Sequence, residues 1–263
     1  MVDAHELLEL ARDIAREAGA LAVRRRLEGV EIAATKSAVA DIVTAADREV
    51  EALIRRRLAE ERPGDGFLGE ESGAERGSTE VTWVVDPIDG TVNYAYGIPH
   101  FAVSIAAVAG EPVPAEWMPL VGVVFDPSHD ELFHAVRGGG AWLGGQRLAV
   151  SGPSAAGALL ATGFGYDPAT HEGDLARVRR VMPLARDLRR AGAASLDLAY
   201  VAAGRLDGYF ERGLHPWDHA AGGLLVTEAG GTLGGEPHGA PGRDMTIAAG
   251  AELFEQITRA VYR

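Results

Sequence analysis

The chain of 263 residues contains no cysteine. This absence excludes disulfides, thiolate metal sites and cysteine nucleophiles. Long apolar runs are also missing, since none approaches the roughly 20 residues that a membrane-spanning helix needs. The first residues, MVDAHELLELARD, lack the basic start and apolar core of a signal peptide. We therefore expect a cytoplasmic protein without a membrane partner.

Positive charge is scarce as well. The 25 lysine and arginine residues are outnumbered by 38 acidic residues, which gives a formal net charge of −13. This negative charge would repel a phosphate backbone, so we expect no nucleic-acid partner. The most basic stretch, RVRRVMPLARDLRR (177–190), is interrupted by hydrophobic residues and predicts a solvated helix face and strand edge.

The rest of the composition is that of a globular protein, with 47% hydrophobic and 24% charged residues. Apolar residues at helical spacing predict helices at 3–27 and 44–61. Strand-like segments follow at 66–70, 81–86, 101–109, 120–126 and 131–136. The stretch 141–150 predicts a hairpin that turns at Gly144–Gly145.

The second half alternates between strands and helices. Strands are predicted at 158–164, 187–190, 207–211 and 245–250, and helices at 172–185, 195–204, 216–231 and from Ala251 onward. Strands that first cluster and then alternate with helices favour a layered α/β protein, with sheets packed between pairs of helices.

The stretch SGPSAAG (151–157) is the best internal boundary, because its residues are small. We expect residues 1–150 to form an N-terminal α+β half that carries the metal-binding motifs. Residues 151–263 would form a C-terminal α/β half that completes the active site, with both halves in one compact unit. A crevice where the halves meet is the expected place for a ligand.

Four short acidic segments each lie near the end of a predicted element: TAAD (44–47), GEES (69–72), DPIDGT (86–91) and HPWDHAAG (215–222). Each alone has a simpler interpretation. Asp-Pro and Asp-Gly are common turn dipeptides, and Thr44 with Asp47 resembles a capping box. Asp218 could be an acidic residue at a helix start, and Glu70 with Glu71 a solvated loop pair.

Together the segments indicate more. Four of their carboxylates could converge on one point: Glu70, Asp86, Asp89 and Asp218. Such a cluster would repel itself unless cations lay between its members. Carboxylates and the backbone carbonyl of Ile88 suit a hard cation such as Mg²⁺. Gly90 and Thr91 open a short helical turn whose N–H groups can receive an anion. The pattern therefore predicts a site for metal and phosphate together.

Two longer stretches, WVVDPIDGTVNYAYGIPHFAVSIA (83–106) and WDHAAGGLLVTEAGG (217–231), resemble the two signature motifs of the inositol monophosphatase family. These are Mg²⁺-dependent, lithium-sensitive phosphatases. GEES and DIVTAAD lie upstream in the expected order, so the resemblance extends from about Lys36 to Gly231. It implies a layered α/β/α/β/α sandwich of the sugar-phosphatase type, a homodimer and inhibition by lithium.

The resemblance also implies two to three Mg²⁺ ions per site. Glu70, Asp86 and the Ile88 carbonyl would bind the first ion. Asp86 would bridge to a second ion, which Asp89 and Asp218 complete, and a third would lie near Glu70. The implied catalytic residues are Glu70, Thr91 and Asp47, of which Thr91 and Asp47 would orient the attacking water.

The implied substrate-binding residues are Asp89, Gly90, Thr91, Gly192, Ala193, Ala194, Glu211 and Asp218. Gly90 and Thr91 would hold the phosphate, and Glu211 would accept hydrogen bonds from substrate hydroxyls. The backbone of 192–194 would contact the sugar or cyclitol ring. Ala193 stands where many relatives carry a hydroxyl residue. Lys36 lies in a loop that is mobile in the family.

These features predict a Mg²⁺-dependent phosphomonoesterase that hydrolyses inositol monophosphate to inositol and phosphate with metal-activated water. Similar relatives hydrolyse histidinol phosphate, fructose 1,6-bisphosphate or phosphoadenosine phosphate, and these esters are the alternatives. A third interpretation is a non-catalytic regulator that binds a phosphometabolite or a protein. Such regulators usually lack a metal ligand or the water-orienting pair, and this chain retains both.

Overall fold

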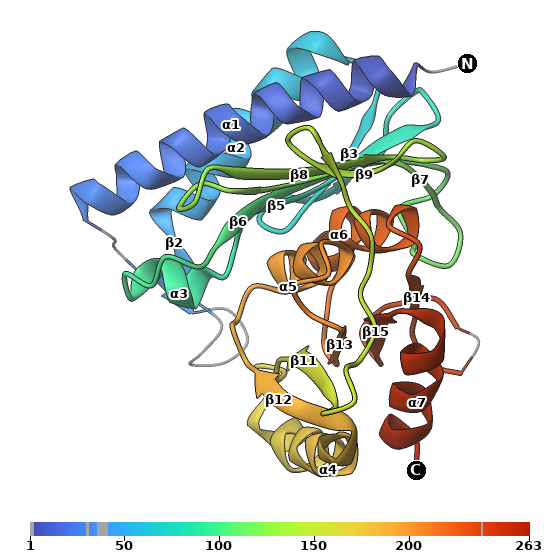
Figure 1. The fold of residues 1–263 in the computed structure, drawn as a ribbon. Coiled ribbons are helices and arrows are strands. Elements are labelled where there is room, and N and C mark those ends of the chain that lie inside the picture. The colour runs from blue at the N-terminus through green and yellow to red at the C-terminus, as the bar shows by residue number, and fades with distance from the viewer. Residues whose placement is uncertain (1–2, 30–31, 36–41, 238) are drawn as a thin grey trace.

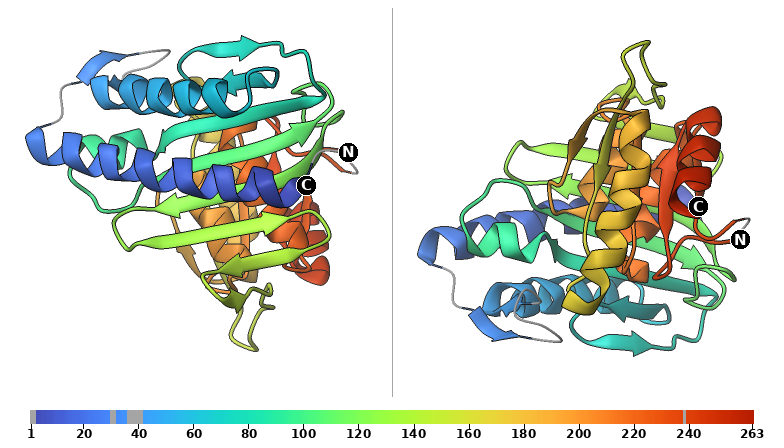
Figure 2. Two further views of the ribbon diagram at one scale, coloured as in Figure 1. Left: turned by 90° about the horizontal axis from the view of Figure 1, so that it is seen from above. Right: turned by 90° about the horizontal axis from the view of Figure 1, so that it is seen from below.

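The computed structural model describes residues 3–29, 32–35, 42–237 and 239–263. Two sheets alternate with three pairs of helices (Figure 1). Helices α1 (Ala4–Glu28) and α2 (Ala45–Glu61) cover the outer face of the first sheet, on which they lie side by side (Figure 2). Helices α5 (Ala194–Ala202) and α6 (Pro216–Glu228) lie between the sheets. Helices α4 (His171–Val181) and α7 (Ala251–Val261) pack together beyond the second sheet. The predicted α/β/α/β/α sandwich is confirmed.

The first sheet has eight strands in the order β10-β9-β8-β7-β6-β5-β3-β4. Their bounds are β3 (Gly66–Gly69), β4 (Gly73–Glu75), β5 (Val81–Asp89), β6 (Ala102–Ala109), β7 (Met118–Asp126), β8 (Glu131–Val136), β9 (Gly140–Leu143) and β10 (Gln146–Arg147). Among these eight strands, β3 and β5 are the one parallel pair. Because helices cover both faces, β5 and β6 are buried almost throughout.

The second sheet has five strands in the order β12-β11-β13-β15-β14. Their bounds are β11 (Ala158–Thr162), β12 (Ala185–Arg189), β13 (Gly208–Glu211), β14 (Thr232–Gly234) and β15 (Thr246–Ala249). Strand β11 runs parallel to both β12 and β13. The short strands β1 (Ile32–Thr35) and β2 (Ile42–Thr44) pair separately, and α3 (Thr91–Ala95) follows β5.

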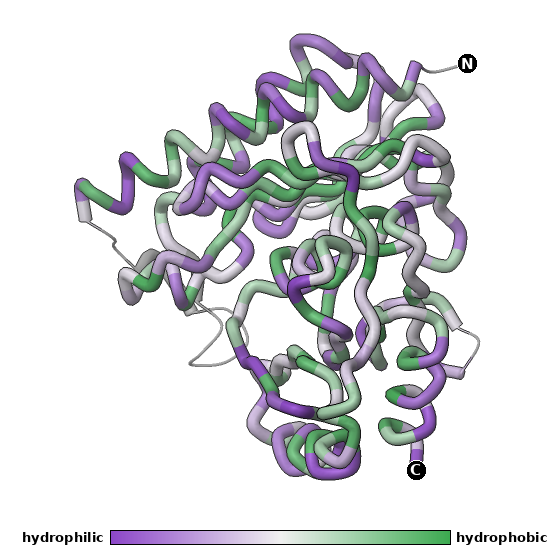
Figure 3. The backbone as a smooth tube through the Cα atoms, in the orientation of Figure 1, coloured by the Kyte–Doolittle hydropathy of each residue, from purple (hydrophilic) through white to green (hydrophobic). Residues whose placement is uncertain are grey.

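Hydrophobic residues gather on the central strands, whereas α1 alternates between polar and apolar residues (Figure 3). One core fills the space between α1, α2 and the first sheet, and includes Ile14 and Trp83. A second core lies between the sheets and joins residues from both halves of the chain, such as Val84 and Leu225. Among the described helices, none combines the length and the apolar character that a membrane span requires.

Most predicted elements are present, and two departures have identifiable causes. The helix predicted at 172–185 ends at Val181, because Pro183 lies in the following 3-10 turn and lacks a backbone donor. The hairpin at Gly144–Gly145 is confirmed. The prediction that the strand ends at Asp86 was wrong. β5 continues through Pro87 to Asp89, with a shift of register against β6 between Asp86 and Asp89.

Candidate active site

Three carboxylates converge where the two halves of the chain meet. Asp86 and Asp89 come from the end of β5, and Asp218 comes from the first turn of α6. One carboxylate oxygen from each lies within 4.8 Å of the other two. Asp86 is only 2% exposed and Asp89 8% exposed. The predicted convergence of these three residues is therefore present.

Hydrogen bonds from backbone amides fix each of these three side chains. The irregular register at Pro87 turns Asp86 toward the Ile88 amide, which donates to Asp86 Oδ1 at 3.1 Å. Asp89 accepts from the amide of Ser195 at 2.7 Å and from its hydroxyl at 2.5 Å, at the start of α5. Asp218 accepts from the His215 amide at 2.6 Å and so caps α6. The simpler interpretation of Asp218 as a residue at a helix start is thus also correct.

The cluster is electrostatically costly by itself. Burial, together with the charges of Glu70 and Asp89, raises the pKa of Asp86 well above its usual range. Burial and the charges of Asp89 and Glu70 also raise the pKa of Asp218, and burial raises that of Asp89. Cations between the carboxylates would offset this repulsion, and an all-oxygen donor set fits Mg²⁺. The residues present therefore fit the implied metal.

Glu70 lies at the edge of this cluster. It directly follows β3, and its amide donates to the Val85 carbonyl at 3.3 Å. Its carboxylate is not one of the three that lie within 4.8 Å of one another, although its charge acts on both Asp86 and Asp218. The three-carboxylate cluster has a geometric basis here, and the role of Glu70 as a ligand remains a prediction.

Asp47 lies near the same end of β5, where it contacts Thr91. Its Oδ1 accepts from the Thr91 hydroxyl at 3.2 Å, although 44 residues separate the two. It also forms the capping box with Thr44 at the start of α2. The Thr91 hydroxyl also lies 3.1 Å from the carbonyl oxygen of Ile88. Burial raises the pKa of Asp47 to about 6, against hydrogen bonds from Thr44 that lower it. Asp47 therefore both belongs to the capping box of α2 and lies beside Thr91.

Gly90 joins the cluster to the loop before α5. It caps α3 with φ +94°, a conformation that glycine adopts without strain. A side chain there would come within 3.0 Å of the His100 carbonyl oxygen and 3.2 Å of that of Gly192. The side-chain amide of Asn93 fixes the position of this loop, because its Nδ2 donates to the carbonyls of His100 and Ala191 at 2.8 and 2.9 Å.

The segment predicted to contact the substrate ring, Gly192 to Ala194, therefore lies beside Gly90. Ala193 is buried, and the Ala194 amide donates to Asp89 at 3.2 Å. This bond holds a predicted metal ligand in place. The contact of these residues with a substrate stays a prediction, and Lys36 lies outside the described residues.

Glu211 ends β13 and approaches the cluster from the second sheet. Its Oε2 accepts from the Tyr209 hydroxyl at 2.5 Å. Burial raises its pKa to about 7, which the Tyr209 hydrogen bond and the charge of Arg190 partly offset. At neutral pH this carboxyl is therefore close to its point of half ionisation.

Sequence reasoning missed three residues that position the site. Ser195 holds Asp89, Asn93 holds the 191–192 loop, and Tyr209 holds Glu211. Local signals existed for two of them. Serine is favoured at a helix start, which marks Ser195, and strand alternation places Tyr209 on the same face of the predicted strand 207–211 as Glu211. Asn93 depends on a contact with a segment about 100 residues away.

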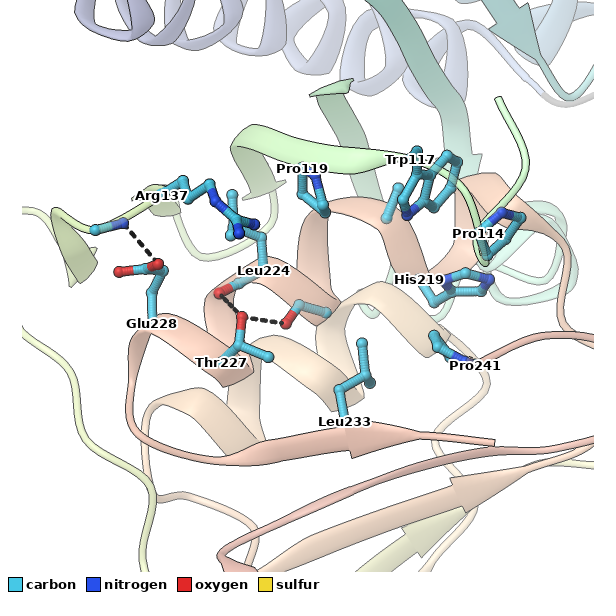
Figure 4. A pocket seen from close by; sticks show the side chains of 13 residues that line it. Pro114, Trp117, Pro119, Arg137, His219, Leu224, Thr227, Glu228, Leu233 and Pro241 are labelled. Carbon is cyan, nitrogen blue, oxygen red and sulfur yellow. Dashed lines mark hydrogen bonds between the residues drawn. The ribbon is translucent and has the colours of Figure 1, made fainter. Parts of the chain in front are cut away.

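A cavity of about 530 Å³ lies on another face of α6, between the start of β7 and β14 (Figure 4). Trp117 and Pro119 form one wall, and His219 and Leu224 belong to the helix. The Thr227 hydroxyl bonds to its own helix at Gly223 and Leu224. None of the predicted site residues lines this cavity. The candidate active site is the acidic cluster.

The geometry and the motifs agree with a comparison of the whole chain. Residues 3–261 match the model of the inositol monophosphatase family. The chain belongs to this family. The resemblance found in the two motifs is therefore confirmed, and it extends to both ends of the chain.

Individual family members are similar over most of their length. An inositol-1-monophosphatase of Rhizobium meliloti is 46% identical over 227 residues, which cover 84% of this chain and 83% of that protein. The Nus factor SuhB of Escherichia coli is 43% identical over 232 residues, covering 87% and 85%. A crystal structure of the extragenic suppressor protein SuhB from Bartonella henselae has a TM-score of 0.90 and 37% identity, covering 98% of this chain and 99% of that one.

Proposed function

We propose that this protein is a Mg²⁺-dependent phosphomonoesterase that hydrolyses inositol monophosphate to inositol and phosphate. The observation that carries the proposal is the convergence of Asp86, Asp89 and Asp218 within 4.8 Å, in a family member 46% identical to an inositol-1-monophosphatase. A buried set of carboxylates without a cation would destabilise the fold, so its retention favours a metal site.

The residues that would hold two to three Mg²⁺ ions are Glu70, Asp86, Asp89, Asp218 and the carbonyl of Ile88. When bound, Mg²⁺ supplies a Lewis acid that activates water and neutralises charge on the ester oxygens. The chain itself contributes the orientation of the reactants. Thr91 and Asp47, which lie 3.2 Å apart, would hold the attacking water by hydrogen bonds.

The phosphate would lie against the backbone of Gly90 and Thr91, at the start of α3. The rest of the substrate would extend toward Gly192, Ala194 and Glu211. An ionised carboxylate accepts hydrogen bonds and donates none, so Glu211 suits a ligand that is rich in hydroxyl groups. This feature favours a polyol ester such as inositol monophosphate over histidinol phosphate, which has no free hydroxyl group.

A panel of phosphate esters tests the proposal. It contains inositol 1-phosphate, histidinol phosphate, fructose 1,6-bisphosphate and phosphoadenosine phosphate, each assayed with and without Mg²⁺. We expect the highest kcat/KM with inositol 1-phosphate, and only when Mg²⁺ is present. A strong preference for one of the other esters would replace the proposed substrate, and equal turnover without metal would contradict the mechanism.

The ionisation of Glu211 predicts a pH dependence. Because the pKa of Glu211 is raised to about 7, the carboxyl is mostly protonated at pH 6 and mostly ionised at pH 8. The KM for inositol 1-phosphate should therefore fall about tenfold over this interval, in proportion to the ionised fraction. Para-nitrophenyl phosphate, which has no hydroxyl group, serves as the control for ionisation of the phosphate itself. A KM with the same pH profile for both esters would contradict this assignment.

The same group predicts a change in stability. A carboxyl whose pKa is raised in the folded state adds stability below its unfolded pKa, and this stability is lost as the pH rises through the folded value. For Glu211 the window runs from about 4.5 to about 7. The variant Glu211→Gln should therefore melt at a higher temperature than the wild type at pH 8, with a smaller difference at pH 5. If the difference in Tm between the variant and the wild type were the same at pH 5 and pH 8, burial would not raise the pKa of Glu211 as described.

A second candidate function comes from the relative named Nus factor SuhB, at 43% identity. That name favours a regulatory role in transcription, without or beside catalysis. Such a role would count against the prediction that the protein has no nucleic-acid partner. A turnover assay separates catalysis from a purely regulatory role, because a pure regulator would bind phosphate esters without releasing phosphate. We favour catalysis because the predicted metal ligands and the Asp47–Thr91 pair are all retained.

We also propose that the protein is a lithium-sensitive cytoplasmic homodimer whose halves, 1–150 and 151–263, act as one unit. The core that joins Val84 and Leu225 supports a single unit. Light scattering of the purified protein tests the dimer, and a lithium titration of phosphate release tests the inhibition.

A further inference from the structure

Glu211 shares one face of β13 with Tyr209, because side chains two residues apart in a strand point to the same side. Tyr209 is fully buried, and its hydroxyl donates to Glu211 Oε2 at 2.5 Å. A buried phenol needs a hydrogen-bond partner, and here that partner is one particular oxygen of the carboxylate. Tyr209 therefore fixes the direction in which Glu211 points.

Gly163, which directly follows the neighbouring strand β11, confines the same carboxylate. A side chain at Gly163 would overlap both carboxylate oxygens of Glu211, so the carboxylate lies directly against the glycine backbone. β11 is held beside β13 by pairing from Leu160 to Thr162, and the Thr162 hydroxyl donates to the Phe210 carbonyl at 2.7 Å. Glu211 is thus enclosed by Tyr209 on its own strand and by the backbone of Gly163.

Charged groups from several elements also face Glu211. Arg190, in the loop before α5, favours its ionised form, whereas Asp89 on β5 and Asp174 on α4 oppose it. Asp197 on α5 and Asp218 on α6 lie close enough for Glu211 to act on them. In this largely acidic environment, the Tyr209 hydroxyl is a neutral donor that supports the charged carboxylate.

We propose that Tyr209 and Gly163 are positioning residues that set the specificity of the site for hydroxyl-rich phosphate monoesters. Tyr209 occupies Oε2 of Glu211, and the glycine leaves room for the carboxylate to lie flat. Oε1 is then the oxygen that accepts a hydroxyl of the substrate. This inference rests on the proposed function and adds to it the two residues that orient the hydroxyl acceptor.

The test compares two esters in the full-length protein with Mg²⁺: inositol 1-phosphate, and para-nitrophenyl phosphate, whose leaving group has no hydroxyl. In Tyr209→Phe the ring stays and only the donor is lost. We expect KM for inositol 1-phosphate to rise about tenfold, the effect of one hydrogen bond to a charged group. The kcat for this ester, and both constants for para-nitrophenyl phosphate, should change by less than about twofold. The pH at which KM changes should also rise, because the ionised carboxylate loses a donor.

A second variant reaches the same carboxylate from the segment that follows β11. Gly163→Ala should displace Glu211 and produce the same selective rise in KM for inositol 1-phosphate. Tyr200→Phe is the matched control, since Tyr200 lies on α5 and packs against Phe133 and Arg205. Its kinetics should match those of the wild type. Turnover of para-nitrophenyl phosphate reports that each variant is folded.

Three results would overturn the inference. Tyr209→Phe could leave KM for inositol 1-phosphate unchanged, or both variants could lower turnover of both esters in parallel, as a general loss of structure would. In either case the proposed function stands, because the wild type still hydrolyses inositol 1-phosphate. A wild type that hydrolyses only para-nitrophenyl phosphate would overturn the proposed substrate and this inference together.

Discussion

Replacing Asp86 by asparagine should lower kcat/KM for inositol 1-phosphate by at least about 1,000-fold. Asp86 lies at the centre of the acidic cluster, and the charges of Glu70, Asp89 and Asp218 all act on it. Asparagine keeps the shape but removes the charge that would bind two metal ions. A bound metal contributes several kcal/mol to transition-state stabilisation, and each 1.4 kcal/mol or so is tenfold in rate. Initial rates of phosphate release at saturating Mg²⁺ measure this effect.

Asp65→Asn is a matched control for this variant. The Asp65 side chain is also only 2% exposed, and it accepts from Trp83 Nε1 at 3.0 Å just before β3. It lies in none of the predicted metal or substrate contacts. Its replacement should cost stability and leave kcat/KM within about threefold of the wild type once folding is checked by Tm. If Asp86→Asn retained more than a tenth of wild-type activity, Asp86 would not be a shared ligand.

Removal of divalent metal should have an effect as large as that of Asp86→Asn. Chelation by EDTA should abolish phosphate release, and added Mg²⁺ should restore it. Because Mg²⁺ would bind the folded cluster only, Mg²⁺ at about 100 times its Kd should also raise Tm by roughly 5–10 °C. Calorimetry of the wild type and of Asp86→Asn checks the second effect, which the variant should lack. Full activity in EDTA, or an equal rise of Tm in the variant, would contradict a metal bound by these carboxylates.

The parts of the site that the sequence could predict are those that depend on local patterns. Asp218 follows Pro216 at a helix start, and Thr44 with Asp47 forms a capping box, so both positions follow from helix chemistry. The motifs around Asp86 and Asp218 were sufficient to indicate the family. The α1 and α2 helices were predictable because their apolar residues recur at helical spacing.

Other features were not predictable, because they depend on pairing between distant segments. Asp-Pro is typical of turns, yet pairing with β6 continues β5 through Asp86–Pro87 to Asp89. The chain turns only at Gly90, in the Asp-Gly dipeptide. The Asp89–Ser195 contact joins residues 106 positions apart. A local signal marks Ser195 as a helix-start residue, but none identifies Asp89 as its partner. Strands β4 and β14 have three residues each, too few to show an alternating pattern.

The central claim is that Asp86, Asp89 and Asp218 share metal ions, and anomalous scattering tests it most directly. Crystals of the wild type would be grown with Mn²⁺, which takes the same oxygen ligands as Mg²⁺. We predict two or more anomalous peaks enclosed by these three carboxylates, with Glu70 beside one of them, and their loss in Asp86→Asn. Crystals that contain Mn²⁺ but show no peak between Asp86, Asp89 and Asp218 would contradict the account.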